Sequence, residues 1–173
     1  LARLGIPILR TLSGSALMEG GSFAWINERT AVIGCGVRVN REGAEQVGEV
    51  LKRQGVELLI IDLFGYDLHI DGSFQMIGKD LAIVDPFGLP YSFLQKLKEL
   101  KVQTVEISPA DDRWIINSLA VAPGELLMPE GASNQTLDAL AKHGVSWTVI
   151  PYGKMQLNGG GIHCSTTPLI RDP

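Results

Sequence analysis

Apolar and polar positions along the chain change their period in a fixed order. Two short apolar runs that favour strands come first, then a stretch with apolar residues at helical spacing, then another apolar run. The first set is expected near 22–26, 30–34, 42–54 and 56–61. Ala44, Val47 and Leu51 form the apolar stripe of the predicted helix, and Gly55 ends it.

The same order of elements occurs twice more. The second set is expected near 73–77, 81–84, 91–100 and 102–107, and the third near 119–122, 125–128, 134–143 and 145–150. Ser133 is the predicted N-cap of the third helix. A unit of this size cannot bury its own apolar face, so each unit must pack on its neighbours. The pattern predicts an α/β fold with mixed sheets in one domain, with units at about 16–62, 66–108 and 114–151.

The stretch from 158 to 170 departs from this pattern, because three glycines run into Ile162, His163 and Cys164. Glycine allows the backbone to approach another group closely, so the thiol can lie at the mouth of a cavity. The alternative is a glycine loop that leads into an ordinary strand with a buried thiol. In either case we expect the stretch to begin a further pair of strands that the chain does not finish.

Composition and charge narrow the classes of function. The net charge is −4 without a basic run, which argues against nucleic acid or an anionic membrane surface as partner. Two cysteines, Cys35 and Cys164, do not make a disulfide framework, and a reducing cytoplasm fits better. No apolar run reaches the roughly 18 residues of a membrane span. The absence of an initiator Met leaves open that the chain begins inside a longer protein.

Candidate chemistry lies at the openings of the units. His69 and Asp71 stand two apart at the start of a predicted strand, where their side chains share one face and can form an acid/base pair. A satisfied surface pair is the alternative. Glu19 precedes two glycines at the corresponding place in the first unit, and an exposed carboxylate is its alternative. Packed units would bring Glu19, His69, Asp71 and Cys164 together.

The residue types in this set point to one kind of substrate. A Cys–His pair suggests acyl or amidine transfer, and two carboxylates match a planar guanidinium. His163 adjoins Cys164, but adjacent strand residues face opposite ways, so His69 is the better base. Cys35, between two glycines in a predicted loop, is interpreted as structural. The three histidines lack the spacing of metal ligands, and neither a metal nor an organic cofactor is expected.

Three motifs resemble those of the guanidino-group modifying enzymes. They are Glu19-Gly20-Gly21, His69-Ile70-Asp71 and Gly159-Gly160-Gly161-Ile162-His163-Cys164, in this order and spacing. That group includes arginine deiminase, dimethylarginine dimethylaminohydrolase, agmatine deiminase and the amidinotransferases. Its fold is the pentein, a five-bladed propeller of strand-strand-helix-strand modules, of which this chain would hold three and part of another.

The resemblance implies a mechanism and a set of roles. Cys164 would attack the guanidinium carbon, Glu19 and Asp71 would hold the guanidinium nitrogens, and His69 would protonate the leaving amine. The intermediate would be a covalent thiouronium, which water activated by His69 hydrolyses. Arg38 matches the arginine that binds the substrate carboxylate, and Gly161 is also assigned to substrate binding. By itself, Arg38 would be a solvated loop residue.

The chain departs from the family pattern in two places. Ser22 stands where the family usually has Asp after Glu-Gly-Gly, and the N-terminal module with a further substrate-binding aspartate is not within the sequence. We expect a second chain or an N-terminal segment to complete the propeller, and a homo-oligomer is a further alternative. The leading interpretation is an arginine deiminase-like cysteine hydrolase. An amidinotransferase and a non-catalytic pentein-fold binding protein are the alternatives.

Overall fold

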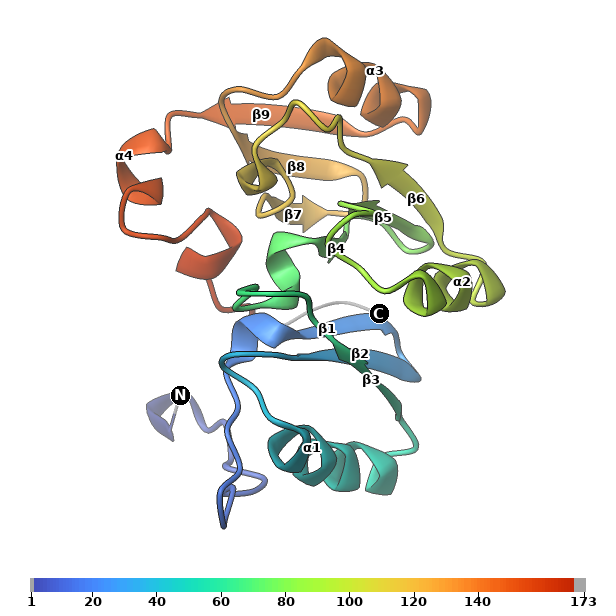
Figure 1. Ribbon diagram of the computed structural model, residues 1–173. Coiled ribbons are helices and arrows are strands. Elements are labelled where there is room, and N and C mark those ends of the chain that lie inside the picture. The colour runs from blue at the N-terminus through green and yellow to red at the C-terminus, as the bar shows by residue number, and fades with distance from the viewer. Residues whose placement is uncertain (1, 170–173) are drawn as a thin grey trace.

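A computed structural model describes residues 2–169 of the chain, and within them three small sheets follow one another (Figure 1). A short 3-10 turn, η1 (Ala2–Leu4), precedes them. The first set of elements is β1 (Phe23–Asn27), β2 (Thr30–Cys35), α1 (Arg41–Arg53) and β3 (Glu57–Asp62). The second set is β4 (Phe74–Met76), β5 (Leu81–Val84), α2 (Tyr91–Glu99) and β6 (Gln103–Glu106). The third set is β7 (Leu119–Ala122), β8 (Glu125–Pro129), α3 (Asn134–Lys142) and β9 (Ser146–Ile150).

All three sheets have the same topology. The middle strand pairs antiparallel with the strand before it and parallel with the strand after the helix. A parallel pair requires a crossover, and the helix between the two strands supplies it. The predicted mixed α/β architecture and the order strand, strand, helix, strand are therefore observed.

Local signals fix where the helices begin and end. The Asn40 side chain accepts a hydrogen bond from the Gly43 N–H at 2.8 Å, which caps α1. Ser133 accepts from the Thr136 N–H at 3.4 Å, as the N-cap prediction required. A residue of positive φ follows each helix: Gly55 (75°), Lys101 (62°) and Gly144 (71°). Lys101 alone among the described residues adopts this conformation with a side chain, which costs roughly 1–2 kcal/mol.

The core lies between neighbouring sheets and beneath the helices. One cluster joins the first two sheets, with Ile26, Val32, Phe74 and Phe93 among its buried members. The rings of Phe74 and Phe93 meet edge to face at a centroid distance of 5.2 Å. A second cluster joins the second and third sheets through Ile83, Val105, Leu126, Met128 and Leu140. Each sheet thus buries its apolar side chains against the next.

This packing gathers the segments that enter each sheet. Each is a 3-10 turn: η2 (Gly20–Ser22), η3 (Ile70–Gly72) and η4 (Arg113–Ile115). The first two lie against each other. A serine immediately before each first strand is almost fully buried, at 0–1% exposure: Ser22, Ser73 and Ser118. Each turn is therefore anchored to the packed interior at or just after its C-terminal end, which holds the side chains near it in fixed places.

The segment that leads to Cys164 corrects one prediction. It contains a short helix, α4 (Gly153–Gln156), and a 3-10 turn, η5 (His163–Ser165), and residues 158–169 contain no strand. The His163 N–H and the Cys164 N–H bond to Asn117, so this backbone is satisfied without a strand partner. Ile170, the last residue of the predicted segment, lies outside the described residues.

Two further findings concern Cys35 and the membrane prediction. Cys35 ends β2 and is 7% exposed, so it lies buried in a strand where a loop was predicted, and its structural role stays a prediction. Among residues 2–169, no helix has the length and apolar character needed to span a bilayer.

Candidate active site

Cys164 lies beside a buried carboxylate. Its Sγ is 3.5 Å from Asp71 Oδ2, and the Asp71 side chain is 8% exposed. Cys164 itself is exposed, in η5, whereas Asp71 lies in η3. The two residues are 93 positions apart and meet because the red segment that contains η5 lies beside the green turn that enters the second sheet (Figure 1).

His163 reaches the same carboxylate, against expectation. Its Nδ1 is 3.1 Å from Asp71 Oδ2, so both His163 and Cys164 face Asp71. The prediction that the two side chains point opposite ways was wrong, because it assumed a strand. In the tight 3-10 turn, neighbouring side chains can approach one partner.

A second cluster holds His69, Glu19 and Arg38. His69 Nε2 is 2.7 Å from Glu19 Oε2, and Arg38 Nη1 is 3.4 Å from Glu19 Oε1. The side chains of Arg38 and Glu19 are 51% and 43% exposed, which leaves both able to exchange partners with a ligand. The predicted proximity of Glu19 and His69 is thus present, and Arg38 joins them.

His69 and Asp71 do not share a strand face, which corrects the reason given for grouping them. His69 precedes η3 in extended backbone and Asp71 lies within the turn. One side chain therefore meets Glu19 and the other meets Cys164 and His163. Among the described residues, no hydrogen bond joins His69 to Cys164. The turn itself links the two clusters.

Two glycines, Gly21 and Gly161, allow their backbone to lie close to the side chains of His69 and Asn117. A Cβ on Gly21 would lie 2.8 Å from the His69 ring, and a Cβ on Gly161 would lie 2.7 Å from Asn117 Cγ. Both distances are shorter than side-chain contacts allow, so neither position accepts a larger residue without movement. Gly161 is buried beneath Cys164, so its observed role is close packing.

Asn117 is the residue that the sequence reasoning missed. It is 1% exposed, its Oδ1 accepts from the Cys164 N–H at 3.2 Å, and its Nδ2 donates to the Asp71 carbonyl at 3.2 Å. A signal was available in the aligned units. Glycine precedes the buried serine in the first two, Gly21 and Gly72, and Asn117 replaces it in the third.

Electrostatics around the thiol favour its neutral form. Burial raises the pKa of the Cys164 thiol, and the nearby Asp71 carboxylate raises it further. A backbone hydrogen bond from Gly161 lowers the pKa, less strongly than burial raises it but more strongly than the charge of Asp71 does, and a side-chain hydrogen bond from Asn117 adds a smaller lowering. A cation bound at Asp71 would offset the repulsion and favour the thiolate.

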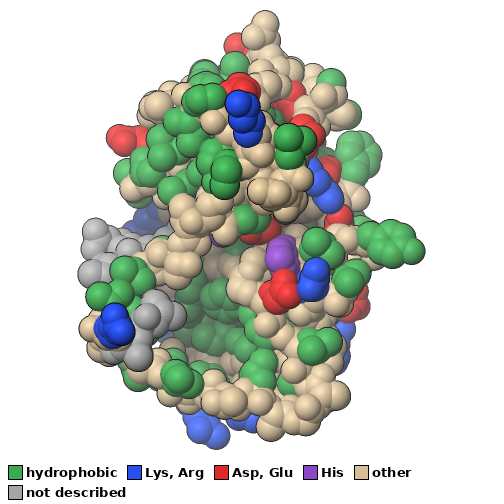
Figure 2. Space-filling view, turned by 90° about the vertical axis from the view of Figure 1, so that its left-hand side faces the viewer, with side chains coloured by type: hydrophobic (Ala, Val, Ile, Leu, Met, Phe, Trp, Pro, Cys, Tyr) green, Lys and Arg blue, Asp and Glu red, His purple; other side chains and the backbone are tan. Residues whose placement is uncertain are grey.

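One face of the molecule is hollowed. Figure 2 shows a histidine beside acidic and basic side chains, next to a hollow lined by hydrophobic side chains. Within residues 2–169, no group of three His, Cys, Asp or Glu side chains is placed to hold a metal ion.

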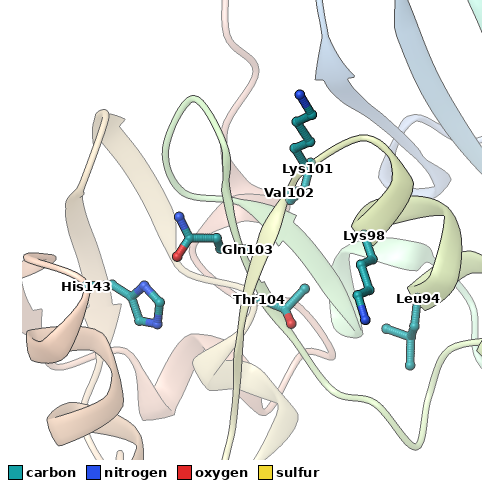
Figure 3. A pocket seen from close by; sticks show the side chains of 7 residues that line it. All are labelled: Leu94, Lys98, Lys101, Val102, Gln103, Thr104 and His143. Carbon is teal, nitrogen blue, oxygen red and sulfur yellow. The ribbon is translucent and has the colours of Figure 1, made fainter.

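A separate pocket of about 490 Å³ lies at the C-terminal end of α2, beside the C-terminal end of α3. Lys98, Lys101 and His143 line it together with Leu94, Val102, Gln103 and Thr104. The ammonium groups of Lys98 and Lys101 point in opposite directions (Figure 3), so they do not converge on a ligand. None of the candidate site residues borders this pocket.

Replacing Asp71 with asparagine is expected to lower the pKa of Cys164. The substitution removes the negative charge 3.5 Å from Sγ, so forming the thiolate becomes less unfavourable. The rate of Cys164 alkylation by iodoacetamide, followed by peptide mass spectrometry across pH, should rise at a lower pH than in the wild type. Glu19→Gln is the matched control and should leave this profile in place. An Asp71→Asn profile that coincides with the wild type or moves to higher pH would show that the Asp71 charge does not raise the pKa of Cys164.

Known proteins resemble the chain in sequence. No protein-family model matches it. The chain is 27% identical over 169 residues to an uncharacterised protein of Aeropyrum pernix and 23% identical over 210 residues to an arginine deiminase of Oenococcus oeni. These alignments cover 98% and 99% of the chain but 59% and 50% of the relatives. The chain thus spans a little over half the length of the curated relatives it matches.

Solved structures resemble the chain in fold. A dimethylarginine dimethylaminohydrolase of Pseudomonas aeruginosa superposes with a TM-score of 0.73 at 18% identity, covering 88% of this chain and 56% of that chain. An amidinotransferase of Microseira wollei superposes with a TM-score of 0.75 at 17% identity, covering 88% of this chain and 47% of that chain. The N-terminal domain of a cyanobacterial arginine dihydrolase superposes with a TM-score of 0.73 at 18% identity, covering 87% of this chain and 55% of that chain. The predicted resemblance to the guanidino-group modifying enzymes is confirmed, and over 87–88% of its length the chain has a fold like that of these solved structures.

Proposed function

We propose that the chain carries the catalytic residues of a cysteine hydrolase acting on the guanidinium group of arginine or a related compound. The observation that supports this most is the contact between Cys164 Sγ and the buried Asp71 carboxylate at 3.5 Å. A carboxylate beside a nucleophilic thiol hinders the thiolate until a cation arrives, which suits a cationic substrate. The similarity in sequence to an arginine deiminase and in fold to a dimethylarginine dimethylaminohydrolase supports the same chemistry.

In this mechanism, Asp71 and Glu19 bind the guanidinium nitrogens through charge-assisted hydrogen bonds. The Cys164 thiolate forms a bond to the guanidinium carbon, and the C–N bond to the leaving nitrogen breaks as His69 protonates it. Ammonia or an amine departs and a thiouronium remains on Cys164. His69 then takes a proton from water, which attacks the same carbon and releases citrulline and the thiolate.

An amidinotransferase is the second candidate, favoured by the superposition on the Microseira wollei enzyme. The two reactions share the attack by Cys164 and the thiouronium. They differ in whether water or an amine then attacks the carbon. Arginine turnover with and without added glycine, with products separated by mass spectrometry, distinguishes ureido formation from transfer of the amidino group.

We also propose that polypeptide beyond residues 1–173 completes the fold, as a second chain or as an N-terminal part of a longer one. The chain covers only 50–59% of its relatives. Large apolar side chains are exposed in the N-terminal segment and just after α4: Ile8, Leu9 and Leu157 are 83%, 67% and 86% exposed. Further polypeptide that covers such side chains would bury apolar surface.

Replacing Cys164 with serine is expected to abolish turnover of a guanidino substrate without unfolding the protein, because a serine hydroxyl is a far weaker nucleophile than a thiolate. Citrulline and ammonia production from arginine, followed with circular dichroism of both proteins, measures this. Cys35→Ser is the control, since that thiol is buried away from the site, and it should retain turnover. Wild-type rates in Cys164→Ser would refute the proposed nucleophile.

Arg38→Ala is expected to lower kcat/KM for arginine more than kcat/KM for agmatine, because agmatine lacks the carboxylate that Arg38 would bind. Charge-assisted hydrogen bonds of about 1.5–3 kcal/mol correspond to roughly 10–150-fold in kcat/KM. The measured quantity is the arginine-to-agmatine ratio of kcat/KM in both proteins. Arg41→Ala, which removes an exposed arginine paired with Asp62, is the matched control. An unchanged ratio would remove Arg38 from substrate recognition.

Native mass spectrometry of the protein purified without a tag from its source tests the proposed completion of the fold. We expect a species heavier than the 18.7 kDa chain, as a complex or as a longer polypeptide, and activity that follows this species. A monomer of 18.7 kDa with full turnover would refute the proposal. A homo-oligomer would show that a second copy covers the apolar side chains.

A further inference from the structure

A buried asparagine stands at the junction of the segments that carry the candidate active site. Asn117 lies between η4 and β7 and is 1% exposed. Its sequence neighbours, Ile116 and Ser118, are 0% exposed, and Ser118 Oγ donates to the Ile115 carbonyl at 2.6 Å. Asn117 is therefore anchored in the core, while its side chain points to η3 and η5.

Three hydrogen bonds join Asn117 to these segments. The Asn117 carbonyl accepts from the His163 N–H at 3.0 Å, and Oδ1 accepts from the Cys164 N–H at 3.2 Å. The Nδ2 group donates to the Asp71 carbonyl at 3.2 Å. A half-turn of the amide would place donor against donor and acceptor against acceptor, so these partners fix its orientation.

The glycine run makes room for this amide. A Cβ on Gly161 would lie 2.7 Å from both Cβ and Cγ of Asn117. Gly161 has no positive φ, so its requirement for glycine arises from this close approach. Hydrogen bonds from the Gly161 backbone and the Asn117 side chain also lower the pKa of the thiol, against the raising effects of burial and of Asp71. Asn117 therefore holds the backbone of Cys164, and both residues favour the thiolate.

We propose that Asn117 is a positioning residue that locks the backbones of Asp71 and Cys164 together and supports the Cys164 thiolate. This inference rests on the proposed role of Cys164 as nucleophile. Asn117 acts through its neighbours, since it is buried and touches the main chains of residues 71, 163 and 164. Without its amide, the Cys164 N–H would lose its acceptor and the thiol would lose a polar neighbour, whereas the hydrogen bond from the His163 N–H to the carbonyl of residue 117 would remain.

The test is the pH profile of Cys164 alkylation by iodoacetamide, read from the Cys164 peptide. In Asn117→Leu the profile should move to higher pH, with alkylation below the pKa slower by roughly tenfold or more, as expected for a hydrogen bond to a charged group. Ser118→Ala is the matched control, because it removes a buried hydrogen bond one residue away without touching Asp71 or Cys164. Its profile should coincide with the wild type.

Asn117→Ala keeps the test valid if Asn117→Leu does not fold, because it only removes atoms from the close contact with Gly161. It loses both the acceptor for the Cys164 N–H and the donor to Asp71, and it adds no charge. Its profile should also move to higher pH. Profiles of Asn117→Leu or Asn117→Ala that coincide with Ser118→Ala would overturn the inference. Because alkylation involves no guanidino substrate, this result is independent of whether the proposed reaction is observed.

Discussion

The burial of apolar side chains between neighbouring three-stranded sheets is the constraint on which the site depends. No single sheet of this size can cover its own apolar face, so Phe74, Ile83 and Leu126 each pack between two sets of elements. This packing places the 3-10 turns that enter the sheets near one another. Residues as distant as Asp71 and Cys164 then come into contact, although neither belongs to the hydrophobic core.

The negative charge of Asp71 acts on several groups of the site. Its nearly buried carboxylate faces both a thiol and an imidazole, and it is held by a turn whose carbonyl receives the Asn117 amide. A buried negative charge requires compensation. A planar cation would supply that compensation and satisfy Asp71 while relieving its repulsion of the thiolate. The arrangement would allow one carboxylate both to bind the proposed substrate and to govern the proposed nucleophile.

Regular elements followed from the sequence because local signals and burial pattern agree there. β5 and β7 have the predicted bounds, and α1 and α3 differ from prediction by a residue or so, since capping residues such as Asn40 mark their ends. The 3-10 turns, in contrast, were not predicted from the sequence. A strand was assumed around Asp71 and after Gly161, so the side-chain directions of His69, Asp71 and His163 were derived wrongly. Asn117 was missed because its partners lie 46 and 47 positions away.

The raised pKa of Cys164 also bears on the resistance of this accessible thiol to oxidation. Oxidants attack the thiolate, and sulfinic and sulfonic products are in general not reversed. Burial and the Asp71 carboxylate keep the sulfur protonated in the empty site, which slows its reaction with peroxide. The carboxylate that would hold the cation thus protects an otherwise accessible cysteine from oxidative loss.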